Sequence, residues 1–94
     1  MKPGTLEVLN RLSETLTARR NADPSTSYTA SLFAKGPDAI LKKIGEETAE
    51  LIMAAKDGKR LPIVNEATDV VYHIMVLMAF FDMSVDDILQ EMHR

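Results

Sequence analysis

The segment IGEETAELI, residues 44–52, places three glutamates among apolar residues that recur at the spacing of a helix. At about 100° per residue, Glu47 falls on the apolar stripe of that helix. The other members of the stripe are Ile40, Ile44, Leu51 and Ala55. A carboxylate on an apolar face needs a partner, because an ionised group removed from water is heavily penalised unless it is paired. The segment therefore predicts a long helix and a binding site on it.

Helix-breaking residues set the limits of this helix and of the next one. Pro37 suits a first helical turn and Gly58 suits a stop, which predicts a helix over 37–57. Pro62 opens another helix, through to about Phe81. Its expected apolar stripe is Ile63, Ala67, Val70, Ile74 and Phe81. A connection this short makes the two long helices antiparallel neighbours.

Three shorter helices complete the predicted fold. Thr5 can cap a helix that fades near Ala22, and Ser27 can cap a short helix over 28–35 that Gly36 ends. Ser84 and Asp87 resemble a capping box for a last helix over 85–93. Sustained alternation typical of strands is absent from the sequence. We therefore expect an all-α fold, a bundle of four to five helices, in one domain over residues 1–94.

Composition excludes several classes of protein. The chain has 11 basic and 14 acidic residues, a formal charge of −3, which is no footprint for nucleic acid or an anionic membrane. It has no cysteine, so disulfides and thiolate metal sites are excluded. The start, MKPGTLEVLN, lacks the apolar core of a signal peptide. The longest apolar run, 70–81, is shorter than the roughly 20 residues of a membrane span. We expect a cytoplasmic protein whose fourth helix is buried.

Each long helix carries acids three residues apart that its neighbour can face. Glu47 and Glu50 lie on the first, and Glu66 and Asp69 lie on the second. Side chains at this spacing are neighbours on a helix surface, so antiparallel packing brings the two pairs together. Lysines do not outnumber these acids, so a hard divalent cation such as Mg²⁺ is needed to offset the repulsion between the carboxylates. The alternative is that the acids are solvated surface charges that bind nothing.

The spacing is also that of a known family signature. EETAE, residues 46–50, followed after fifteen residues by EATD, residues 66–69, resembles the EExxE…ExxD motif of the MazG-like all-α nucleoside triphosphate pyrophosphohydrolases. SYTASLFAKGPDAILKKIGEETAEL and NEATDVVYHIMVLM closely resemble the phosphoribosyl-ATP pyrophosphatases among them. The resemblance runs from about Leu6 to Met92. It implies hydrolysis of phosphoribosyl-ATP to phosphoribosyl-AMP and pyrophosphate, the second step of histidine biosynthesis.

The resemblance also implies roles for residues of this chain. Glu47, Glu50, Glu66 and Asp69 match the magnesium ligands of the superfamily. Glu46 completes the motif and holds a second metal ion or orients the attacking water. Water would attack the α-phosphorus, since pyrophosphate leaves. The family fold is a helical bundle that assembles as a homodimer, with sites at the interface of the helix pair.

Basic and hydroxyl side chains near the acids are candidates for substrate binding. Lys42 and Lys43 lie one turn before the acids and can either meet the triphosphate or pair with Glu46 and Glu47, with Lys43 better directed. Lys35, Lys59 and Arg60 are more typical of surface charge. Ser27, Tyr28 and Thr29 either form a helix cap with a packed tyrosine or, as the resemblance favours, line the pocket for the base or ribose.

The fourth helix raises two further questions. His73 lies one turn beyond Asp69 and is either a hydrogen-bonded core residue, the interpretation we favour, or a ligand near the metal. The helix itself is apolar on nearly all of its faces, because its residues include Met75, Met78 and Phe80. Such a helix is central in its bundle or buried against another subunit, and in a chain of this size we favour the second option.

The same residues allow two rival functions. One keeps the chemistry and changes the substrate to dUTP, dCTP or an aberrant nucleotide, because acids and metal recognise only phosphates. The 27–36 segment favours phosphoribosyl-ATP. The other rival is a helical dimerisation module with surface acids, which predicts neither hydrolysis nor stabilisation by Mg²⁺.

Overall fold

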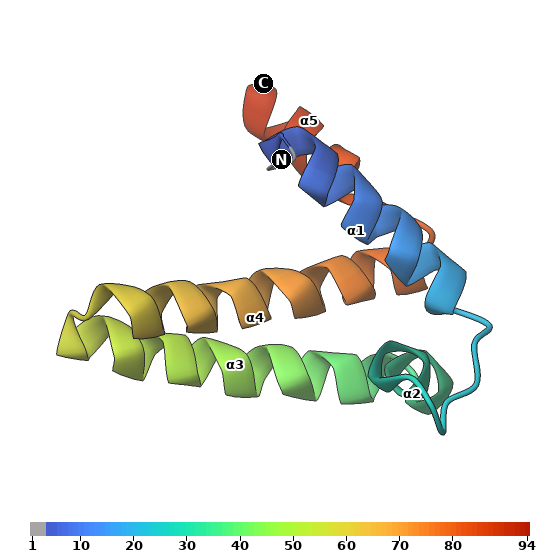
Figure 1. Cartoon of the computed structure of the whole chain (residues 1–94), viewed down its shortest axis with the longest axis horizontal. Coiled ribbons are helices and arrows are strands. Elements are labelled where there is room, and N and C mark those ends of the chain that lie inside the picture. Colours follow the sequence, from blue (N-terminus) through green and yellow to red (C-terminus); the bar gives the residue numbers. More distant parts are fainter. Residues whose placement is uncertain (1–3) are drawn as a thin grey trace.

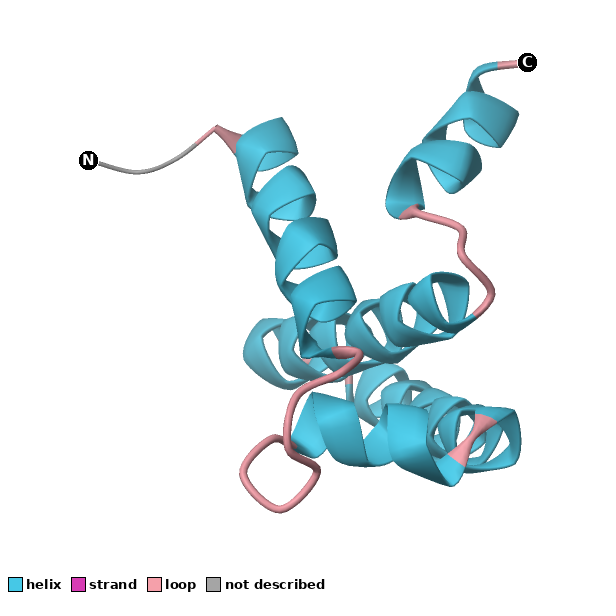
Figure 2. Ribbon diagram, turned by 90° about the vertical axis from the view of Figure 1, so that its right-hand side faces the viewer, coloured by secondary structure: helices cyan, strands magenta, loops and turns pink. Residues whose placement is uncertain are grey.

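A computed structural model describes residues 4–94, and within them the chain is all-α. Its helices are α1 (Thr5–Arg19), α2 (Tyr28–Lys35), α3 (Pro37–Asp57), α4 (Arg60–Phe80) and α5 (Val85–His93). Helices α3 and α4 run antiparallel along their length, and α2 lies across the end of α3 where that helix begins (Figure 1). Helices α1 and α5 lie on the side of α4 that faces away from α3 (Figure 1 and Figure 2). The predicted all-helical fold is confirmed.

The turn between α3 and α4 is built by one glycine. Gly58 ends α3 with φ 73°, in the left-handed region, and its N–H donates to the carbonyl oxygens of Ala54 and Ala55. A residue with a Cβ is strained in that conformation, which explains the abrupt stop. Helix α4 then begins at Arg60, two residues earlier than predicted, and Pro62 lies inside its first turn. Proline is tolerated there because N–H groups of a first turn have no partner within the helix.

Two glycine substitutions, one inside α3 and one just after it, should have opposite effects on stability. Gly58→Ala should lower the free energy of unfolding by about 1 kcal/mol, because Ala at φ 73° is strained. Gly45→Ala should raise it by about 0.5–1 kcal/mol, because Gly45 is inside the helix and a Cβ there meets open space. Urea unfolding of both variants measures these changes. Changes of the same sign in the free energy of unfolding of the two variants would contradict the assigned turn.

The shorter helices begin and end largely as their local sequence predicts. The Ser27 hydroxyl accepts from the Ala30 N–H, and Ser84 and Asp87 form the capping box of α5. Helix α1 differs from the prediction, because Gly4 occupies the N-cap position and Thr5 is already helical. It also ends at Arg19, before Ala22. Just after α1, the guanidinium of Arg20 donates a 2.9 Å hydrogen bond to the Phe80 carbonyl oxygen of α4.

The core lies where α1, α2 and α3 meet the second half of α4. Leu16, Ile40 and Val76 are almost completely buried there. Two predicted stripe residues lie elsewhere. Ala54 is buried and Ala55 is exposed, because successive steps of four residues drift by about 40° and Ala54 points closer to the direction of Glu47. Phe81 is 53% exposed, because the chain has left α4 at that residue.

Helix α4 is only partly buried within a single chain, and its burial against another subunit stays a prediction. Its buried residues are His73, Met75 and Val76, whereas Val64 and Val71 are nearly half exposed. Among the described residues it is the one helix long and apolar enough to cross a membrane by length and composition. Glu66 and Asp69 lie within it, and acids at membrane depth are costly.

Candidate functional site

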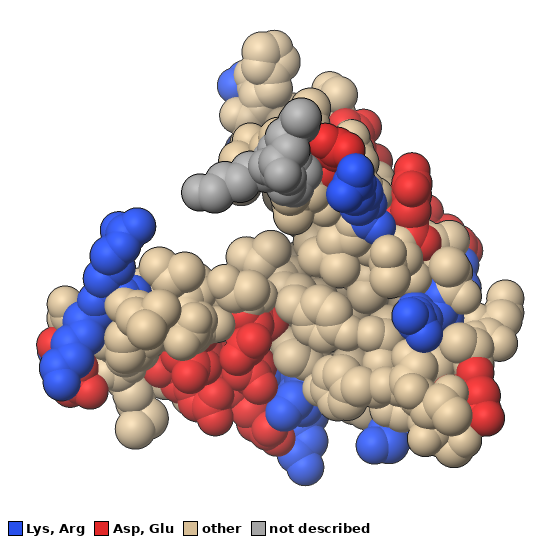
Figure 3. Space-filling view, viewed as in Figure 1, with Lys and Arg blue, Asp and Glu red and all other residues tan. Residues whose placement is uncertain are grey.

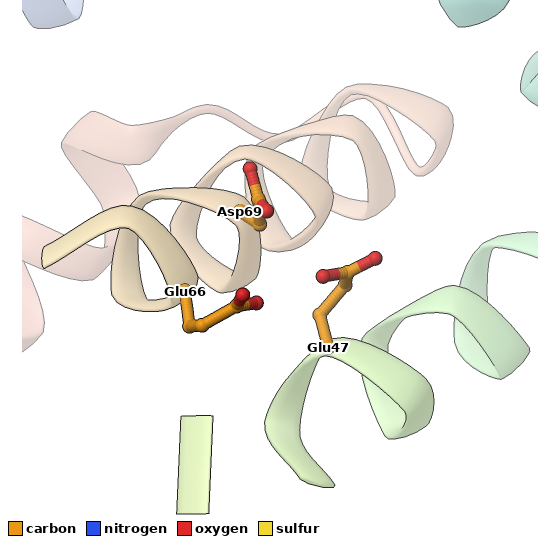
Figure 4. Close-up of side chains that lie close together, drawn as sticks. All are labelled: Glu47, Glu66 and Asp69. Carbon is orange, nitrogen blue, oxygen red and sulfur yellow. The ribbon is translucent and has the colours of Figure 1, made fainter. Parts of the chain in front are cut away.

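Three of the four predicted ligands come together across the α3–α4 seam. Glu47 projects from the middle of α3 toward Glu66 and Asp69, which lie one turn apart on α4 (Figure 4). Each contributes a carboxylate oxygen, and these oxygens all lie within 4.8 Å of one another. The antiparallel hairpin thus does what the spacing predicted for these three residues. Oxygen-only donors at this separation form a ligand set suited to a hard cation.

Two oxygens of this three-acid cluster are buried and unpartnered. Glu47 is only 8% exposed. Within residues 4–94, Oε2 of Glu47 and Oε2 of Glu66 are both buried and accept no hydrogen bond. Such oxygens are costly unless a cation or a donor reaches them. Their burial distinguishes the cluster from a solvated acidic surface and shows that the donor set fits a divalent cation.

Lys43 lies at the edge of the three-acid cluster. Its Nζ is 3.4 Å from Glu47 Oε1 and 3.4 Å from Glu46 Oε2. The hydrogen bond to Glu47 raises the pKa of the Lys43 ammonium, so this group stays charged at neutral pH. One ammonium does not neutralise both Glu46 and Glu47, and Glu66 and Asp69 add two more negative charges to the seam. Acidic side chains indeed gather over the seam with basic ones beside them (Figure 3).

A basic pocket of about 290 Å³ adjoins these acids. Lys35 from α2 lines it together with Lys42 and Lys43 from α3. Glu46 and Tyr28 also contribute to its wall. Three ammonium groups around one cavity suit a ligand that carries several negative charges. The sequence analysis placed Lys35 among the surface charges, because only the packing of α2 on α3 brings it beside Lys42.

The hydroxyl residues of the 27–29 segment differ in their availability. The Ser27 hydroxyl caps α2, and Thr29 is buried with its hydroxyl bonded to that of Tyr72. Tyr28 is 51% exposed at the pocket wall, and its hydroxyl is 2.8 Å from Nε2 of His73. Tyr28 is therefore the member of this segment best placed to meet a ligand.

His73 is a hydrogen-bonded residue of the core, as favoured from the sequence. It is 5% exposed, and its Nδ1 lies 2.7 Å from the backbone carbonyl oxygen of Asp69. Its other nitrogen faces Tyr28. Both ring nitrogens thus have protein partners, and His73 is not a member of the three-acid cluster.

The remaining predicted residues lie at the periphery. Glu50 is exposed and is not among the three acids whose oxygens converge, so its role as a ligand stays a prediction. Lys59 and Arg60 lie at the α3–α4 turn, at the opposite end of the helix pair from α2 (Figure 1). Their position agrees with surface charge.

Comparison with known proteins identifies the family. Residues 9–94 match the family model described as phosphoribosyl-ATP pyrophosphohydrolase. The chain is 68% identical to a phosphoribosyl-ATP pyrophosphatase of Dechloromonas aromatica, over 96% of this chain and 83% of the relative. It is 56% identical to the phosphoribosyl-ATP pyrophosphatase of an Azoarcus species, over 95% of this chain and 83% of the relative. The chain therefore belongs to the phosphoribosyl-ATP pyrophosphohydrolase family.

Proposed function

We propose that this chain hydrolyses phosphoribosyl-ATP to phosphoribosyl-AMP and pyrophosphate, the step of histidine biosynthesis for which its relatives are named. The observation that carries the proposal is the three-acid cluster, with its buried unpartnered oxygens, beside a pocket lined by three lysines. Acids without the lysines would suit many cations. Lysines without the acids would suit many anions. Their adjacency suits a polyphosphate held together with its metal ion.

Mg²⁺ is the proposed cofactor, with Glu47, Glu66 and Asp69 as ligands. Glu50, one turn from Glu47, is the proposed fourth ligand and would have to turn toward the other three. When bound, the ion neutralises phosphate charge and makes water more acidic. The buried oxygens of Glu47 and Glu66 gain the partner that the protein alone does not give them within the described residues.

The residues around the pocket have separate roles in this proposal. Lys35, Lys42 and Lys43 bind the phosphate oxygens and stabilise the charge that develops as pyrophosphate leaves. Water attacks the α-phosphorus, so one bond from water oxygen to phosphorus forms and the bond to the bridging oxygen of pyrophosphate breaks. The Glu46 carboxylate, at the pocket wall, takes the proton from that water. Positioning and charge neutralisation supply most of the rate enhancement, as in other phosphoryl transfers.

We also propose that the chain works as a cytoplasmic homodimer. An apolar groove of about 460 Å³ between α1 and α4 supports this, and Leu9, Leu12, Val64 and Val71 line it. An uncovered groove lined by apolar side chains is typical of an interface. Light scattering on the pure protein should give twice the mass of one chain, and a monomer at micromolar concentration would contradict the proposal.

Release of pyrophosphate from phosphoribosyl-ATP tests the proposed reaction. The pure protein should release it with Mg²⁺ and should not release it with EDTA. dUTP and dCTP, assayed in parallel, distinguish this activity from that of a general nucleotide hydrolase. Turnover of the deoxynucleotides alone, or of no substrate, would overturn the proposed function.

A further inference from the structure

We infer that Tyr28 recognises a hydrogen-bond donor on the nucleoside part of the substrate, and that His73 is the positioning residue that restricts the Tyr28 oxygen to accepting. The inference rests on the proposed function and adds a determinant of specificity to it. It depends on the chain of contacts from Asp69 through His73 to Tyr28.

The first step fixes the tautomer of His73. A backbone carbonyl oxygen can only accept, so the 2.7 Å contact with Asp69 requires His73 Nδ1 to donate. A neutral imidazole carries a single N–H, and its other nitrogen then has only a lone pair. In the neutral imidazole Nε2 therefore accepts, and its partner at 2.8 Å is the Tyr28 hydroxyl. The phenol hydrogen of Tyr28 is committed to His73.

The second step follows from the chemistry of a phenol. Burial raises the pKa of Tyr28, so the hydroxyl is not ionised at neutral pH. With its one hydrogen donated to His73, the oxygen can only accept further hydrogen bonds. A phosphate oxygen is also an acceptor and is not recognised by such a group. The complementary ligand group carries an O–H or N–H, which in this substrate means a ribosyl hydroxyl or the nitrogen substituent of the adenine ring.

The packing of α2 on α3 places Tyr28 in the same pocket as the lysines. The Tyr28 ring is half exposed and lines the same pocket as Lys35 and Lys42. The Lys43 ammonium lies between the carboxylates of Glu46 and Glu47, 3.4 Å from an oxygen of each. The pocket thus has a cationic side for phosphates and an accepting oxygen for a donor group. This asymmetry would orient the nucleoside relative to the three-acid cluster.

A second tyrosine offers a matched control. Tyr72 precedes His73 on α4, and its hydroxyl bonds that of Thr29, which follows Tyr28 on α2. Both tyrosine hydroxyls therefore join α2 to α4. Thr29 is 8% exposed, so the Tyr72–Thr29 bond is a link within the fold. Replacing either tyrosine by Phe removes one hydroxyl and one bond between the same two helices.

The test measures kcat and KM for phosphoribosyl-ATP in wild type, Tyr28→Phe and Tyr72→Phe. Tyr28→Phe should raise KM roughly 3- to 10-fold with little change in kcat, as expected when one hydrogen bond made equally in ground and transition states is lost. Tyr72→Phe should lower the melting temperature about as much as Tyr28→Phe does, but it should not change KM. An unchanged KM in Tyr28→Phe, or an equal rise in both variants, would overturn the inference.

Two His73 variants separate its two hydrogen bonds. The side-chain carbonyl of Gln reaches about as far as Nε2 and can accept from Tyr28. Asn is shorter, and its amide N–H can donate only to the Asp69 carbonyl oxygen. We therefore expect His73→Gln to keep most of the wild-type KM. His73→Asn should raise KM by less than Tyr28→Phe does, because the Tyr28 oxygen is still present but is no longer positioned. Identical KM values for the two variants would refute the positioning role of His73.

Calorimetric binding of the product phosphoribosyl-AMP supplies a readout that needs no turnover. Tyr28→Phe should weaken this binding by the same factor as KM rises. If Tyr28→Phe weakens the binding of AMP by the same factor, the donor group lies in the adenosine. If the binding of AMP is unchanged, the donor group lies in the added ribosyl group. Unchanged binding of phosphoribosyl-AMP would overturn the inference. Absence of hydrolysis by wild type would instead overturn the proposed function.

Discussion

Replacing Glu47 with Gln should reduce pyrophosphate release from phosphoribosyl-ATP by at least about 10²-fold, in line with loss of one preorganised electrostatic group. Glu47 is the ligand that α3 contributes to the three-acid cluster, and it is the most buried of the three. Gln keeps the shape of the side chain but carries no charge for a cation. The measurement is steady-state turnover at saturating Mg²⁺.

The fold of the Glu47→Gln variant should survive, which separates a site effect from unfolding. Removing one of three facing carboxylates lessens their mutual repulsion, so in EDTA the variant should melt no lower than wild type. Glu14→Gln, an exposed residue of α1, is the matched control and should leave turnover unchanged. Full activity in Glu47→Gln would refute its assignment as a ligand.

Mg²⁺ should raise the melting temperature of the wild-type protein by roughly 10–20 °C. An ion that binds only the folded state at 100 times its Kd contributes about 2.7 kcal/mol. In a domain of this size, each kcal/mol corresponds to about 4–8 °C. The stabilisation arises because the ion reaches the buried oxygens of Glu47 and Glu66 and offsets the repulsion within the three-acid cluster. Thermal unfolding followed by circular dichroism at fixed protein concentration measures it.

Two controls make the Mg²⁺ effect specific. NaCl at matched ionic strength screens exposed charges but does not coordinate, so it should have a much smaller effect. In Glu47→Gln most of the shift with Mg²⁺ should be lost. If the variant and the wild type shift equally, the ion is bound elsewhere, and the three-acid cluster is not the metal centre.

Local chemistry in the sequence determined where most helices begin and end. The Ser27 cap, the Ser84–Asp87 capping box and the left-handed Gly58 each act through backbone groups a few residues away. Such short-range effects are readable without the fold. The predicted cap at Thr5 is shifted by one residue to Gly4, which makes no side-chain cap hydrogen bond.

The three-acid cluster was also predictable, because one assumption sufficed. Glu66 and Asp69 are neighbours on a helix by spacing alone, and a short turn makes α3 and α4 antiparallel. That Glu47 then faces them follows from its place on the apolar stripe. The contribution of Glu50 did not follow in the same way, since small rotations of α3 decide which of two neighbouring acids points across the seam.

Tertiary packing alone decided the surroundings of the site. His73 meets Tyr28 across 45 positions of the chain, and Lys35 reaches the pocket of Lys42 only because α2 lies against α3. It also left much of α4 uncovered within a single chain, so the predicted burial of this helix against another subunit stays a prediction. The sequence by itself determined helix ends and the convergence of acids, because these depend on spacing within a helix or across one turn. Partners from separate helices depend on how those helices cross and rotate against each other, which is set by the packing of the whole core.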